Sequence, residues 1–232
     1  MSKRKQRRED FDFAAGEVLL IDKPYEWTSF DVVNKVRYAV KVKKVGHAGT
    51  LDPLATGLLI LCTGKMTKQI QYIQAEEKEY VGQMVIGETR PSVDMETEVD
   101  STTDYSHITE EDVRKLLPEF TGLIQQIPPA HSAVKVGGKR AYNAAREGKE
   151  IKIDPREVEI KELEILHIDF PTIDFRMVCS KGTYVRSFVR DFGEKLGVGA
   201  YMSGLRRTRI GEHKLTDAYA LDKFIEMIKQ EQ

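Results

Sequence analysis

The sequence is compatible with an α+β fold, because segments with the period of a strand and segments with the period of a helix both occur along its 232 residues. Residues 58–62 (LLILC) form a short apolar run that is typical of a buried strand. Residues 79–87 (EYVGQMVIG) show the twofold alternation of a half-buried strand. Thr109 precedes a helix-like segment and is followed three positions later by Asp112, which is the spacing of a capping box.

The other elements are predicted from the same patterns. Thr28 or Ser29 can cap a helix that places Val33, Val36 and Val40 on one face. Thr183 is expected to cap a helix over 184–196 that Gly197 ends. The remaining expected helices are 67–74, 139–147 and 218–228. The remaining expected strands are 17–21, 156–170 and 172–179.

The composition is that of an ordinary soluble globular protein, with 41% hydrophobic and 31% charged residues. No apolar run approaches the about 20 residues of a membrane span, and no apolar segment follows the basic N-terminus as in a signal peptide. We therefore expect a cytoplasmic protein without membrane contact. Cys62 and Cys179 lie in apolar runs and are expected to be reduced core thiols. The histidines show no metal-ligand spacing, so no metal site is expected.

Charge is distributed unevenly although the formal net charge is only −1. Residues 88–112 contain nine acidic residues against one basic residue, Arg90. Residues 131–156 contain seven basic residues against three acidic ones. A basic segment can follow a phosphate backbone while the total charge stays near zero. On charge alone, solvated faces of opposite sign remain the preferred explanation.

The chain is organised around residues 44–68, which contain a single carboxylate, Asp52. Gly46 and Gly49 precede Asp52 and permit backbone conformations that are closed to other residues. Pro53 fixes its own φ and biases Asp52 towards an extended conformation. An acid is therefore held on a stiff loop before a buried strand, as a catalytic group requires. An Asp-Pro pair taken alone would more often cap a turn.

Four runs of the sequence resemble a single family. GHAGTLDPLATGLL (46–59) resembles the active-site sequence of the bacterial tRNA pseudouridine-55 synthases, the TruB family. IPPAHSAVKVGGKRAYNAAREGKEI (127–151) resembles its RNA-gripping thumb insertion, with His131 where an aromatic residue is usual. CSKGTYVRSFVRDFG (179–193) contains the Gly-Thr-Tyr-x-Arg of the family, and SGLRRTR (203–209) is the last similar run. The arginines of this last run would face RNA or pair internally.

The resemblance implies a pseudouridine synthase fold, with a mixed, largely antiparallel sheet and flanking helices. Residues 1–10 are expected to be a disordered basic arm. Residues 11–232 are expected to form the catalytic domain, with the thumb insertion at about 126–156 and no C-terminal RNA-binding domain of the PUA type. The implied substrate is the T arm of tRNA, and we expect a monomer that needs no guide RNA and no obligatory protein partner.

The resemblance also assigns site residues. Asp52 would be the nucleophile, and whether it adds to the base or to the sugar, or assists elimination to a glycal, stays open. Arg186 would pair with Asp52 and keep it ionised. Tyr80 would stack on the extruded uracil and assist removal of the C5 proton. The remaining expected substrate-binding residues are His47, Tyr184, Leu205, Lys23, Lys139 and Arg140.

The implied reaction isomerises uridine: the C1′–N1 bond breaks, the base turns, and a C1′–C5 bond forms. Nothing is oxidised and no phosphate is spent, so no cofactor is expected. One alternative is a guide-RNA-dependent synthase, but such enzymes carry a PUA domain and lack the thumb insertion. Another alternative is a non-catalytic RNA-binding or tRNA-folding module on the same scaffold. Asp52, Tyr80 and Arg186 are all present, which argues against the loss of chemistry.

Overall fold

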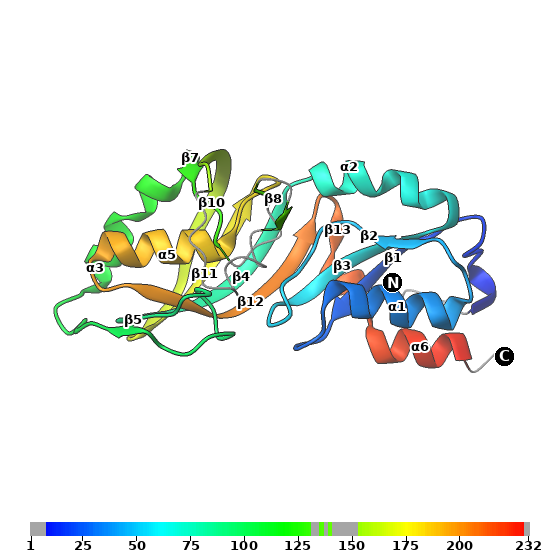
Figure 1. The fold of residues 1–232 in the computed structure, drawn as a ribbon, viewed down its shortest axis with the longest axis horizontal. Helices are drawn as coiled ribbons and strands as arrows, with labels where there is room; N and C mark the ends of the chain where they lie inside the picture. The colour runs from blue at the N-terminus through cyan, green and yellow to red at the C-terminus, as the bar shows by residue number, and fades with distance from the viewer. Residues whose placement is uncertain (1–7, 131–134, 137–138, 141–152, 230–232) are drawn as a thin grey trace, which may run out of the picture. The chain divides into compact units, whose positions relative to one another are not determined.

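The computed structural model describes residues 8–130, 135–136, 139–140 and 153–229 (Figure 1). These residues form helices and mixed, largely antiparallel sheet, so the predicted α+β fold is confirmed. The chain divides into two compact units, which we call unit 1 (Met1–Lys78 with Arg206–Gln232) and unit 2 (Glu79–Leu205). Strands β4 (Lys78–Ile86) and β12 (Ala200–Ile210) each contain one boundary between the units.

Unit 1 contains a sheet and three α-helices. Its strands follow the order β14-β1-β3-β12, with β2 paired to β3 and β13 paired to β12. The strands are β1 (Val18–Lys23), β2 (Val45–His47), β3 (Thr56–Thr63), β13 (His213–Lys214) and β14 (Tyr219–Ala220). The helices are α1 (Ser29–Val40), α2 (Ile70–Ala75) and α6 (Leu221–Lys229), and 3-10 turns occupy η1 (Arg8–Asp10), η2 (Gly64–Gln69) and η4 (Leu215–Asp217).

Strand β3 is buried on both of its faces, which explains its unbroken apolar run. Leu59 and Leu61 pack with the buried faces of α1 and α6. Leu58 and Ile60 belong to a second cluster, against which residues of α2 pack. Figure 1 shows α1 and α6 on one side of this sheet and α2 on the other. A strand between two apolar layers has no solvent face, so it does not alternate between apolar and polar residues.

Capping chemistry fixes the start of α1 and settles which residue caps it. Thr28 is the N-cap: its side chain accepts a hydrogen bond from the Asp31 backbone N–H, and the Asp31 carboxylate accepts one from the Thr28 N–H. The same reciprocal pair joins Thr109 and Asp112 at the start of α3, as predicted. Ser29, the other candidate cap of α1, is buried and contacts the loop that carries Asp52.

Unit 2 contains strands in the order β12-β4-β11-β10-β7 and two short hairpins. The two long strands β10 (Arg156–Asp169) and β11 (Thr172–Cys179) pair antiparallel, and β7 (Gly122–Gln126) pairs antiparallel with β10. The hairpins pair β5 (Glu88–Thr89) with β6 (Ser101–Thr102) and β8 (Lys135–Val136) with β9 (Lys139–Arg140). The helices in the described part of unit 2 are α3 (Glu110–Lys115) and α5 (Val185–Leu196), and a 3-10 turn forms η3 (Leu117–Phe120).

Helix α5 is held by an aromatic cluster. The Phe188 ring lies 5.5 Å from the Phe120 ring, 5.3 Å from the Phe175 ring and 5.5 Å from the Phe192 ring, measured between centroids. These residues come from η3, β11 and α5, so the cluster ties the helix to the sheet of unit 2. Helix α5 ends at Gly197, which adopts a left-handed conformation as predicted.

Several sequence predictions about single elements are wrong. Thr183 does not cap α5, because its hydroxyl donates to the Ser180 carbonyl and Tyr184 occupies the N-cap position. The C-terminal helix begins at Leu221, because the two residues before it pair with β1. Lys139–Arg140 pair with β8 instead of opening a helix, and the rest of that expected helix lies outside the described residues. Ala200–Ile210 is a strand that the sequence patterns did not predict.

Two other predictions, those for β4 and for the two cysteines, are confirmed. Strand β4 buries Tyr80 and the three alternate residues after it, on the face that its alternation predicted. Cys62 and Cys179 are buried and reduced. Residues 1–7 of the expected basic arm lie outside the described residues, and Arg8–Asp10 form a 3-10 turn. Among the described residues, no helix combines the length and apolar character needed to cross a bilayer.

The aromatic cluster should dominate the stability of unit 2. Because Phe188 is fully buried among three rings, we expect Phe188→Ala to lower the free energy of unfolding by about 3–5 kcal/mol. Urea denaturation measures this change. Leu123→Ala is the matched control: Leu123 is 69% exposed on β7, so its loss should cost less than about 1 kcal/mol. Equal losses in both variants would contradict the burial described for Phe188.

Candidate active site

Asp52 lies on a tight loop between β2 and β3 of unit 1, where it is half-buried. The Asp52 carbonyl accepts a hydrogen bond from the Ala55 N–H at 3.0 Å, which closes a turn over Pro53. The Pro53 carbonyl accepts a hydrogen bond from the Glu26 N–H at 3.0 Å. The loop backbone is therefore held at the residue after Asp52, in agreement with the stiff loop that the sequence predicted.

Lys23, at the end of β1, binds the same loop from within the core. Its side chain is fully buried, and Nζ donates to the carbonyls of Pro53 at 3.0 Å, Trp27 at 2.5 Å and Pro24 at 3.0 Å. An ammonium has three donors, so these three carbonyls use all of them. The geometry thus gives Lys23 a role in holding the loop.

Two further side chains bind the loop before Asp52. The Ser29 hydroxyl accepts from the Leu51 N–H at 2.9 Å and donates to the Leu51 carbonyl at 3.1 Å. The buried Arg207 guanidinium donates to the carbonyls of Gly49 at 3.1 Å and Thr50 at 3.4 Å. The loop is consequently bound on both sides of Asp52 by side chains from β1, α1 and β12.

Burial and charge set the protonation of this region. Burial lowers the pKa of Lys23 to about 8; the Asp52 carboxylate opposes the shift and the Arg207 guanidinium adds to it. Burial also lowers the pKa of His47; the Gly49 backbone opposes that shift and Arg207 again adds to it. At neutral pH the region therefore contains an ammonium and a guanidinium near Asp52, beside a neutral His47 imidazole.

Unit 2 contains the other expected catalytic residues. Tyr80 lies on β4 and is 8% exposed. Arg186 lies in the first turn of α5 and is 4% exposed. Its Nη1 donates to the Ser92 carbonyl at 3.0 Å, and its Nε lies 3.7 Å from Oδ2 of Asp94. A buried guanidinium is thus held by a buried carboxylate and a carbonyl within unit 2.

Sequence reasoning missed Ser92 and Asp94. The acidic, turn-rich segment 89–106 is typical of a surface excursion, and most of it is exposed, but Ser92, Val93 and Asp94 are buried. Val93 has a φ of 62°, which is unusual for a β-branched residue. This left-handed turn directs the chain inward before Asp94, whose backbone bridges to Met202 of β12. Nothing in the local sequence distinguishes Asp94 from the exposed acids around it.

The expected pocket residues of unit 2 occupy well-defined positions. Tyr184 is half-buried at the start of α5, and the Gln126 side chain binds its backbone N–H and carbonyl. The Arg156 guanidinium lies over the Tyr184 ring, 5.5 Å from its centroid. Leu205 is half-buried on β12. The backbones of Lys139 and Arg140 form β9, and their side chains lie outside the described part of the structure.

The expected site residues divide between the two units. Lys23, His47 and Asp52 belong to unit 1, whereas Tyr80, Tyr184, Arg186 and Leu205 belong to unit 2. The pairing of Arg186 with Asp52 stays a prediction. The question that the sequence left open for SGLRRTR is answered: Arg206 pairs with Asp22 at 2.7 Å, Arg209 pairs with Glu77 at 2.8 Å, and Arg207 binds carbonyls.

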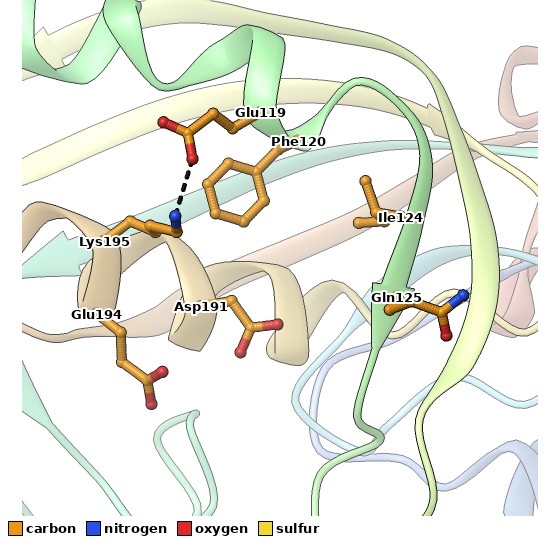
Figure 2. Close-up of a pocket in the computed structure, with 7 residues that line it drawn as sticks. All are labelled: Glu119, Phe120, Ile124, Gln125, Asp191, Glu194 and Lys195. Atoms are coloured by element: carbon orange, nitrogen blue, oxygen red, sulfur yellow. Dashed lines mark hydrogen bonds and ion pairs between the residues drawn. The ribbon is translucent and has the colours of Figure 1, made fainter.

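A hollow of about 490 Å³ in unit 2 lies apart from these residues (Figure 2). It is formed by side chains of η3, β7 and α5, and its Glu119 and Lys195 pair at 2.9 Å. None of the expected site residues lines it, so we do not place the chemistry there. Across the described residues, no three His, Cys, Asp or Glu side chains gather in an arrangement that could hold a metal ion.

Comparison with known proteins identifies the family. The model of the N-terminal domain of TruB family pseudouridylate synthases matches residues 37–185, and that of the C-terminal domain of tRNA pseudouridylate synthase B matches residues 186–232. A tRNA pseudouridine synthase B of Phocaeicola vulgatus is 50% identical over 227 residues, which cover 95% of this chain and 97% of the relative. The protein of the same name from Parabacteroides distasonis is 52% identical over 225 residues, covering 94% and 96%.

A solved structure agrees with this result. The crystal structure of a Cbf5–Nop10–Gar1 complex matches with a TM-score of 0.73 and 30% identity. The match covers 97% of this chain and 59% of the solved chain. Fold and sequence together define a pseudouridylate synthase, an enzyme that isomerises uridine in RNA. The chain belongs to the TruB family of these enzymes.

The lowered pKa of the buried Lys23 should make the free energy of unfolding depend on pH. Its pKa is lowered from 10.5 to about 8 on folding, so the unfolded chain binds more protons between these values. The free energy of unfolding should therefore rise with pH across this window, by up to about 3 kcal/mol. Urea denaturation at pH 8 and pH 10 would show a smaller rise for Lys23→Met than for the wild type. Equal rises would contradict the lowered pKa.

Proposed function

We propose that this protein converts a uridine of tRNA to pseudouridine at position 55 of the T loop, with Asp52 as the nucleophile. The observation that carries the proposal is the loop around Asp52, where buried side chains bind the backbone on both sides of one carboxylate. A nucleophile needs such preorganisation. The substrate class is supported by relatives about 50% identical over almost their full length, which are named tRNA pseudouridine synthase B.

The chemistry needs a carboxylate that is held in place, and the loop backbone around Asp52 is bound on both sides. Lys23 and Arg207 are the buried cations that bind its carbonyls. The Asp52 carboxylate attacks the flipped nucleotide and bonds to it, the C1′–N1 bond breaks, and the C1′–C5 bond forms. The bond to Asp52 then breaks, which releases the product and regenerates the carboxylate. The C5 proton leaves and N1 gains a proton, so the reaction is balanced without an oxidant or a phosphate donor.

The residues of unit 2 complete the proposed site. Arg186 pairs with Asp52 and orients it, and Asp94 holds the Arg186 guanidinium in turn. Tyr80 stacks on the extruded uracil and assists removal of the C5 proton. His47, Tyr184 and Leu205 bind the substrate around it. Lys139 and Arg140, in the proposed thumb at about 126–156, contact the RNA backbone.

We further propose that the protein acts in the cytoplasm without a guide RNA. The relatives of matching length and about 50% identity support this reading. The alternative is suggested by a solved structure titled as an H/ACA RNP bound to a substrate RNA, which is 27% identical and of which this chain covers 56%. The higher identity and coverage of the tRNA pseudouridine synthase B relatives favour the guide-free enzyme.

Asp52→Asn tests the nucleophile. The amide is nearly isosteric but uncharged and weakly nucleophilic, so we expect single-turnover pseudouridine formation to fall by at least about 1,000-fold. Affinity for tRNA should stay within about threefold, because phosphate contacts supply most of it. Asp100→Asn, which changes an exposed carboxylate of unit 2, is the matched control and should keep the wild-type rate. Substantial turnover in a folded Asp52→Asn protein, with deamidation excluded by mass spectrometry, would reject the assignment.

An isolated T stem-loop tests the substrate and the independence from a guide. If the enzyme reads only this arm, the stem-loop should react with a kcat/KM within about tenfold of full tRNA, or about 1.4 kcal/mol. The assay contains only the protein and the RNA, and pseudouridine is mapped by position. Modification at another uridine would refute position 55. Activity that appears only after a guide RNA and partner proteins are added would support the guide-dependent alternative.

A further inference from the structure

Arg207 is buried to 1% exposure, although the sequence left open whether it would face RNA. Its guanidinium binds backbone carbonyls: Nε donates to Leu58 on β3 at 2.8 Å, and the two Nη atoms donate to Thr50 and Gly49. Taking a guanidinium out of water is costly, so its hydrogen bonds to these carbonyls have to offset that cost.

The carbonyls that accept hydrogen bonds from Arg207 lie on two segments next to Asp52. Gly49 and Thr50 lie three and two residues before Asp52, on the same loop, whereas Leu58 lies in the rigid strand that follows. The planar guanidinium has its donors in a fixed fork, so it sets the direction of these carbonyls as well as their distance. Arg207 thereby fixes the approach to Asp52 relative to β3. Lys23 binds the loop only after Asp52, at the Pro53 carbonyl.

The backbone of Arg207 lies unusually close to that of Gly57, at the start of β3. Arg207 pairs with Gly57 in the parallel β12–β3 ladder. Gly57 has a φ of 101°, and a Cβ atom there would lie 2.3 Å from the Arg207 carbonyl oxygen. Only glycine permits this approach. The start of β3 and the middle of β12 are therefore closer than side chains would allow, at the point where Arg207 enters the core.

The charge of Arg207 also acts on its neighbours. It lowers the pKa of both Lys23 and His47, in addition to the effect of their burial. The carboxylates of Asp52 and Asp31 act on Lys23 in the opposite direction, because both raise its pKa. His47 consequently reports on the position of the guanidinium without any catalytic turnover.

We propose that Arg207 is a positioning residue for the pseudouridylate synthase reaction, which acts by holding the Gly49–Thr50 carbonyls so that the Asp52 carboxylate meets the substrate in reactive geometry. This inference rests on the proposed role of Asp52 as the nucleophile. A residue that only stabilised the core would not act selectively on the chemical step. Loss of the positioning role of Arg207 should slow the chemical step and leave RNA binding unchanged. Arg207 touches neither the substrate nor the reacting atoms in this assignment.

Arg207→Met and Arg207→Lys test the proposal with two measurements. For Arg207→Met, we expect single-turnover pseudouridine formation to fall by about 100-fold, the effect of a misplacement of about 1 Å. Its Kd for tRNA should stay within about threefold of the wild type. Arg207→Lys keeps the charge but loses the fork, and should fall by about tenfold. The control Arg209→Met removes a neighbouring arginine of β12 that pairs with Glu77 instead, and should stay within about twofold.

The second measurement is the titration of His47 by NMR, with its signal assigned by comparison with His47→Gln. Because Arg207 lowers the pKa of His47, that pKa should rise in Arg207→Met and stay close to the wild type in Arg207→Lys and Arg209→Met. This measurement needs no turnover. A wild-type protein inactive on tRNA would reject the proposed function, while the His47 titration would still test the contact.

The rate and the His47 titration of the Arg207 variants decide whether Arg207 positions Asp52. A folded Arg207→Met with a rate within about threefold of the wild type overturns it. An unchanged His47 titration in that variant, a loss confined to tRNA affinity, or an equal loss in Arg209→Met also overturns it. If Arg207→Met does not fold, Arg207→Lys decides: a rate within about threefold overturns the proposal, and about a tenfold loss at unchanged tRNA affinity supports it.

Discussion

Hydrogen bonds from buried cations to backbone carbonyls hold the loop on which the proposed chemistry depends. Lys23 and Arg207 each donate hydrogen bonds to carbonyls of residues that flank Asp52, among their other acceptors. A carbonyl oxygen carries only a partial charge, so these contacts leave much of each positive charge uncompensated. The protein thereby obtains a rigid backbone and a positive potential from the same two side chains. Exchanging either cation for an apolar residue would remove both at once.

A second buried cation is held differently in unit 2. Arg186 has a buried carboxylate, Asp94, near its Nε and the Ser92 carbonyl on Nη1. The carboxylate comes from a segment that reaches it through the left-handed turn at Val93. Backbone strain of this kind persists only where the surrounding structure enforces it, and it concentrates at functional sites. Asp94 therefore belongs to the proposed site although the acidic segment around it is mostly exposed.

The elements that the sequence predicted well are those set by neighbours along the chain. The strand with Tyr80, the buried strand after Asp52, and the capping boxes at Thr28 and Thr109 all depend on residues a few positions apart. The family resemblance supplied the order of the fold, which local patterns do not contain. It is also the source of the proposal that Asp52 is the nucleophile.

The missed features depend on residues far apart in the chain. Arg207 binds acceptors about 150 residues earlier, and its sequence context of three arginines is equally typical of an RNA-binding surface. Asp94 contacts Arg186, which also lies far away in the sequence, and the acidic residues around Asp94 are mostly exposed. The C-terminal helix starts late because Tyr219–Ala220 pair with β1, at the opposite end of the sequence. No local pattern contains these tertiary contacts.

The discontinuity of unit 1 has a consequence for biosynthesis. Its core combines β1, β3 and α1 with α6, and its sheet requires β12 and β14, so it draws on both ends of the chain. Unit 2 is continuous between Glu79 and Leu205. On the ribosome, the first 78 residues must therefore wait, with the apolar faces of β3 and α1 incompletely covered, while all of unit 2 is made. Since unit 2 can complete its contacts first, the segment carrying Asp52 reaches its final packing only near the end of translation.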